Sequence, residues 1–204
     1  EQSRRATASQ RQGQQRNRAL RERASSLTPA QVEQLSAQLK EKPGDADTYW
    51  TLVYYYEQKW DPKGRSALWL WFIEHHPDGP RSPGTINPQH DREGYARGRS
   101  LWLAHLKRPG ATAAVYERAA WFLEAGDGPL ALAALEAGQK AYPDDQRWTR
   151  AISQHYARTV LASGGTGAEQ DARSRHVKDV RERLDGSNDA KVLAQTAYWL
   201  IILT

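Results

Sequence analysis

The sequence contains no cysteine, which excludes disulfide bonds, thiolate metal sites and cysteine nucleophiles. It also lacks any run of about 18 apolar residues, so no transmembrane helix is predicted. The most apolar stretch, Tyr198 to Leu203, is far too short to span a bilayer. Phenylalanine is scarce, with two residues against eight tryptophans and nine tyrosines. The larger aromatic rings must therefore supply much of the packing.

Net charge is confined to the first 26 residues, which hold seven arginines and two glutamates, whereas acidic and basic residues balance in 27–204. This N-terminal stretch has almost no apolar periodicity, so we expect residues 1–26 to form a flexible basic tail. Residues 14–24 would become a polar helix only if something docked on them. The tail has three interpretations: a solvated leader, a docking segment for an acidic partner, or a salt-sensitive, nonspecific nucleic-acid contact. Arginine without interleaved aromatic residues argues against specific nucleic-acid binding.

Regular structure is predicted from Thr28 onward. Thr28 is a suitable helix N-cap, and the proline that follows it suits the first helical position. Prolines then end successive segments at positions 43, 77, 109 and 143, spaced 34, 32 and 34 residues apart. A period near 34 is typical of helical repeats.

The segment 111–144 resembles one unit of the tetratricopeptide repeat, a pair of antiparallel helices that ends in a proline turn. With Pro143 in the family's proline position, the pattern of small, aromatic, turn and large apolar residues falls on Ala119, Phe122, Gly126-Asp127, Ala131, Leu135 and Gly138. The small residues would let two helices approach closely. The resemblance implies an all-α fold, a right-handed α-solenoid of antiparallel helix pairs over residues 27–204.

The other units depart from this pattern. Arg65 stands where the segment 45–77 should carry a small residue, and prolines and glycines in 78–90 exclude a regular helix and predict an irregular loop. Further helices are expected over 91–106, 146–162, 168–184 and 189–203, with a glycine-rich linker at 163–167.

The resemblance also implies a concave surface that binds other proteins. Its ligand-facing positions fall on Trp50, Tyr54, Glu57 and Gln58 in one unit, on Tyr116, Ala120 and Glu124 in another, and on Arg150, Gln154 and Arg158 in a third. Aromatic rings beside polar groups suit a peptide groove. Packing in the core is an equally weighted alternative for Trp50 and Tyr54.

Catalytic, metal and cofactor sites are not predicted. His75 and His76 are adjacent and lack the spacing of a zinc-binding helix, and we expect them in the last turn of a helix. The glycine-rich segment 163–167 lacks the Lys-Ser/Thr pair of a phosphate-binding loop. The sequence therefore favours a non-enzymatic scaffold that binds a peptide or partner protein.

An alternative function is self-assembly into an oligomer or filament. The apolar residues that would form the joint are Tyr198, Trp199, Leu200, Ile201, Ile202 and Leu203. Such a helix must be buried, either in its own core or in a neighbouring subunit. The chain begins at Glu1 with a leader rich in Gln, Arg and Ser, which fits a bacterial extracytoplasmic or secreted protein after signal removal. A trimmed cytoplasmic protein fits as well.

Overall fold

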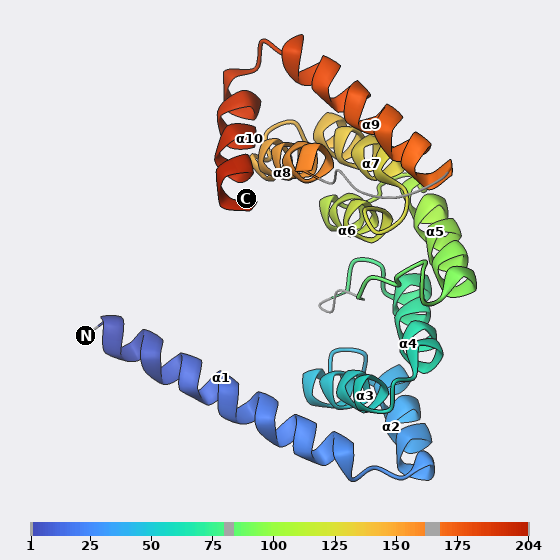
Figure 1. Cartoon of the computed structure of the whole chain (residues 1–204). Coiled ribbons are helices and arrows are strands. Elements are labelled where there is room, and N and C mark those ends of the chain that lie inside the picture. Colours follow the sequence, from blue (N-terminus) through green and yellow to red (C-terminus); the bar gives the residue numbers. More distant parts are fainter. Residues whose placement is uncertain (1, 80–83, 162–167, 204) are drawn as a thin grey trace. The chain divides into compact units, whose positions relative to one another are not determined.

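The computed structural model describes residues 2–79, 84–161 and 168–203, and within these ranges it contains ten helices and no strand (Figure 1). The all-α prediction is confirmed. The helices are α1 Gln2–Ser25, α2 Pro29–Glu41, α3 Ala46–Gln58, α4 Pro62–His75, α5 Arg92–Leu106, α6 Ala113–Leu123, α7 Gly128–Ala141, α8 Arg147–Leu161, α9 Ala168–Asp185 and α10 Ala190–Leu203. Among them, no helix combines the length and apolar character needed to cross a membrane.

The chain divides into two compact units. Unit 1 comprises Glu1–Gly84 and Gln89–Gly98, and unit 2 comprises Thr85–Pro88 and Arg99–Thr204. The boundaries between the units fall within the proline-rich segment 78–90, of which residues 80–83 lie outside the described residues, and within α5, between Gly98 and Arg99. The described remainder of that segment contains no helix, as its prolines predict. The whole of the predicted linker, 163–167, also lies outside the described residues.

Unit 1 is organised around α3. Thr28 caps α2 through a reciprocal capping box with Gln31, and Asp45 caps α3 by accepting from the amides of Asp47 and Thr48. The apolar face of α2 then packs on α3 and α4, in a core formed by Val32, Leu35, Leu39, Tyr49, Leu52, Val53 and Phe72. Opposite this core, α1 packs along α3 (Figure 1).

The helix α1 corrects the expectation of a flexible tail over residues 1–26. Its residues are mostly good helix formers, and its C-terminal half gains tertiary contacts through Leu20 and Ala24, which are buried with Tyr54. Between Gln12 and Ser25, the part of α1 whose side chains are described, Leu20 and Ala24 are the buried residues, and they produce almost no periodic signal in the sequence. The docking partner predicted as a condition for helix formation is α3 of the same chain.

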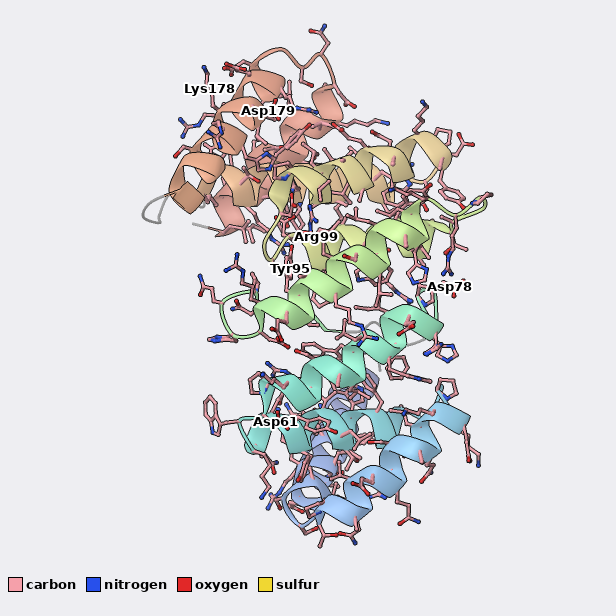
Figure 2. The ribbon with its side chains drawn as sticks, turned by 90° about the vertical axis from the view of Figure 1, so that its right-hand side faces the viewer. Asp61, Asp78, Tyr95, Arg99, Lys178 and Asp179 are labelled. Atoms are coloured by element: carbon pink, nitrogen blue, oxygen red, sulfur yellow. The ribbon has the colours of Figure 1, made fainter. Side chains whose placement is uncertain are left out.

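Unit 2 contains the segment that resembles a repeat unit. Helices α6 and α7 pack closely because the methyl side chains of Ala119 and Ala131, both fully buried, are too small to hold them apart. The aromatic position, Phe122, is buried as well. Gly138 faces the ring of Trp148 on α8, which brings α7 and α8 together. In the same unit Arg99 of α5, labelled in Figure 2, donates to the capping carboxylate of Asp127 at 3.1 Å.

The departure at Arg65 has a structural explanation. Its guanidinium lies 4.9 Å from the centre of the Trp69 ring, and its Nη1 lies 3.8 Å from the Oε1 of Glu57. Helices α3 and α4 accordingly pack less closely than α6 and α7. The N-terminus of α4 is held by Asp61, labelled in Figure 2, which accepts from the amide of Gly64 at 2.8 Å.

Candidate partner-binding surface

Four residues at helical spacing define one side of α3: Asp47, Trp50, Tyr54 and Gln58, here called the α3 surface. The rings of Trp50 and Tyr54 are stacked, with centroids 6.0 Å apart. Trp50 remains 40% exposed, whereas Tyr54 is buried. The packing alternative therefore applies to Tyr54, whose ring is covered, whereas Trp50 is open and its role in binding stays a prediction. Glu57, which the resemblance also implies, pairs instead with Arg65.

Helix α1 packs on the α3 surface and buries Tyr54, the one residue of that surface that is covered. Leu20 and Ala24 bury their side chains against Tyr54, and the Arg21 guanidinium lies 4.2 Å from the centre of the same ring. The amide of Gln58 donates to the main-chain carbonyl of Arg21 at 3.0 Å. The N-terminal basic segment thus binds to a predicted ligand-facing surface of its own chain.

A second polar contact lies at the other end of the α3 surface. Arg16 donates from Nε and Nη2 to the same oxygen, Oδ1, of Asp47, with a distance of 2.8 Å from Nε. Because Arg16 meets Asp47 while Arg21 meets Gln58, α1 and α3 run in the same direction. The two polar contacts fix the register of α1, and the apolar contact lies between them.

The predicted residues of α8 are also placed beside another helix of the chain. Helix α10 packs along α8, where Ser153 donates its hydroxyl to the carbonyl of Val192 at 3.2 Å. The Arg150 guanidinium lies 5.5 Å from the centre of the Trp199 ring. Gln154 is half-buried and Arg158 is exposed. In each unit, one helix that carries predicted ligand-facing residues is therefore packed against another helix.

The predicted residues of α6 do not form an open surface. Ala120 is buried in the core of unit 2, and Tyr116 packs against that core with its ring centroid 6.5 Å from that of Trp148. The Oε2 atom of Glu124 lies 2.7 Å from Nδ1 of His155 and accepts a hydrogen bond from it. These three side chains therefore form contacts within unit 2.

Glu124 belongs to a buried polar cluster that the sequence analysis did not predict. The Nε2 atoms of His155 and His176 lie 3.1 Å apart, and the hydroxyl of Thr159 lies 3.4 Å from His155 Nε2. Burial lowers the pKa of His176, and the neighbouring His155 lowers it further. The one signal in the sequence was the stripe Trp148, Ile152, His155, Thr159, which places polar groups on the apolar face of α8.

The predicted self-association residues lie on α10. Trp199 and Leu200 are half-buried, whereas Tyr198, Ile201, Ile202 and Leu203 are exposed, Ile201 at 76%. The opposite side of α10 faces α8 through Val192 and Thr196, which are buried. The helix therefore folds onto its own unit with one face and leaves a second apolar face open.

Unit 1 also contains a cavity of about 580 Å³ that the sequence does not predict. It lies among α2, α3, α4 and α5, with Tyr56, Leu68 and Trp71 in its wall. Three cationic side chains, Lys40, Lys63 and Arg97, and three acidic ones, Glu74, Asp91 and Glu93, also line it. Arg97 and Glu74 form an ion pair of 3.3 Å across part of this wall.

Among the described residues, no cluster of three or more His, Asp or Glu side chains is arranged to hold a metal ion. His75 and His76 lie at the end of α4, as predicted, with their rings against Trp71. Comparison of the chain with models of protein families, with curated proteins and with solved structures finds no match in any of the three.

Proposed function

We propose that the chain is a non-enzymatic protein-interaction scaffold that uses the α3 surface to bind a helical segment of a partner protein. The observation that carries the proposal is the docking of α1. This polar helix is held by the packing of Leu20 and Ala24 on Tyr54, by an arginine–aromatic contact and by polar contacts to Asp47 and Gln58. The surface therefore has the groups that a helix-binding groove needs.

The proposal includes a tetratricopeptide-like arrangement of helix pairs in a right-handed solenoid. Its support comes from the close pairing of α6 with α7 at Ala119 and Ala131, and from the proline turn after α7. In this arrangement α1, α3, α6, α8 and α10 are the first helices of successive pairs. The contacts of α1 with α3 and of α8 with α10 fit such first-helix neighbours.

A peptide-display selection tests the binding function. Helical peptides are selected on the full chain and then assayed on the variants Trp50→Ala and Trp121→Ala. Trp121 is the matched control because it is also an exposed tryptophan, at 47% against 40% for Trp50, but lies on α6. We expect selected peptides to lose at least tenfold in affinity on Trp50→Ala only. Equal binding to both variants would refute the use of the α3 surface.

Self-association is a second candidate function, favoured by the open face of α10. Tyr198, Ile201 and Ile202 share one side of the helix at the spacing i, i+3, i+4 and are each more than half exposed. A cluster of large apolar side chains on a surface marks an interaction site. A second copy of the chain could cover it by an isologous contact.

Sedimentation velocity over a range of concentrations tests this second candidate. We expect the wild-type chain to associate as concentration rises, and Ile201→Lys to remain monomeric. Trp121→Lys is the control, because it places the same charge on an exposed apolar side chain of α6. A monomeric wild type, or identical association of all three proteins, would contradict self-association through α10.

A further inference from the structure

Helix α1 binds the α3 surface with few apolar contacts. Between Gln12 and Ser25 its buried side chains are Leu20 and Ala24, and the others are exposed. Its ion pair with Asp47 is also exposed, at 54% for Arg16 and 53% for Asp47, where such pairs contribute little to stability. Docking must also offset the conformational entropy that is lost when a polar helix becomes ordered. Helix α1 is therefore a weakly held occupant of this surface.

The apolar stripe of α1 stops short of the end of the α3 surface. Residues 13, 17, 20 and 24 share one side of the helix, and two of them are Gly13 and Asn17. Asn17 is exposed, and a Cβ added at Gly13 would meet nothing within 4 Å. The N-terminal half of the stripe thus leaves open space where a docked helix could place apolar side chains.

Trp50 is the aromatic residue of the α3 surface that α1 leaves exposed. It lies between Asp47 and Tyr54 on α3, and α1 runs parallel to α3 from Arg16 at Asp47 to Leu20 at Tyr54. The segment of α1 that passes Trp50 therefore begins at Asn17. A helix with a large apolar residue at the place of Asn17 would cover Trp50 as well as Tyr54, and an apolar residue at the place of Gly13 would extend the apolar stripe by one turn.

We propose, resting on the function proposed above, that α1 is an internal ligand of the α3 surface and that an arginine-bearing amphipathic helix of a partner protein displaces it. The partner helix has arginines where α1 has Arg16 and Arg21, because Asp47 and the face of Tyr54 receive them. It has apolar residues at all four positions of the stripe. Because α1 competes for the α3 surface, a partner helix must bind that surface more tightly than α1 does. Poorly matched helices are therefore excluded.

The test uses a fluorescein-labelled peptide with the sequence of residues 12–28, in which leucine replaces Gly13 and Asn17. We expect saturable binding to the full chain, at least tenfold tighter than that of the peptide with the unchanged sequence. Leu20→Asp in the chain should raise affinity for the peptide at least tenfold, because it releases the internal helix. Trp50→Ala should lower it, whereas the control Trp121→Ala should not.

Three results would overturn the inference. They are equal affinity for wild type and Leu20→Asp, equal affinity for the two tryptophan variants, and a dimer that dissociates into monomers when the peptide binds. Dissociation of a dimer would mean that the α3 surface of each chain is occupied by α1 of a second copy. If display selection returns ligands that depend on Trp50 but lack arginines and do not compete with the peptide, the binding function stands and this inference fails. If no ligand depends on Trp50, both fail.

Discussion

Gly138 offers a direct test of the close packing of α7 on α8. A Cβ placed on this residue would lie 2.5, 2.6 and 2.9 Å from three carbon atoms of the Trp148 ring. The ring cannot swing away, because Trp148 is 1% exposed and packed within the core of unit 2. In a helix interior, alanine is favoured over glycine by about 1 kcal/mol. Overpacking a filled core costs about 1–3 kcal/mol, and contacts this short belong at the upper end.

We therefore expect Gly138→Ala to lower the free energy of unfolding by a net amount of about 1–2 kcal/mol, despite the gain in helix propensity. Urea unfolding followed by far-ultraviolet circular dichroism measures the change. Gly13→Ala is the matched control, since it adds the same methyl group to a helix where no atom lies within 4 Å. The cost should shrink when Trp148→Phe is combined with Gly138→Ala. A stabilised Gly138→Ala variant would refute the close contact of α7 with α8.

Two further predictions concern titratable groups. Because burial lowers the pKa of His176 in the folded chain, the unfolded chain binds more protons as pH falls through about 6.5, so stability should be constant above that pH and decrease below it. Urea midpoints at pH values on either side of 6.5 measure this, and an equally steep loss in His176→Gln would contradict the assignment. Hydrogen bonds from Thr48 lower the pKa of Asp45, the N-cap of α3. Asp45→Ala should cost about 0.5–2 kcal/mol at neutral pH and Asp45→Asn much less, and equal losses in the urea midpoint would show that capping is not the cause.

The sequence predicts the parts of the fold that depend on local chemistry. The cap at Thr28, the helix ends near the prolines and the small residues between α6 and α7 are all readable without the structure. Helices whose apolar residues recur at regular spacing are found for the same reason. Arg65 was flagged as a departure, and only the structure shows that it stacks on Trp69.

The remaining features depend on contacts between residues distant in the sequence. Helix α1 is stabilised by its contact with α3. Because that contact is not visible in the sequence of residues 1–26, their composition alone indicates a disordered tail. Tyr116 and Glu124 match ligand-facing positions, yet neighbouring helices cover one and bind the other. The pairing of His155 with His176 joins two helices across a segment that contains no repeat signal. Local patterns cannot reveal which of these side chains meet.

The central claim is that α1 docks on the α3 surface through Leu20 and Ala24. Hydrogen–deuterium exchange of residues 12–25 tests it most directly, with the wild-type chain compared with Leu20→Asp. The account predicts that residues from Arg16 to Ala24 exchange more slowly in the wild type than in the variant, with α2 and α4 equally protected in both. Equally fast exchange of residues 16–24 in both proteins would contradict it.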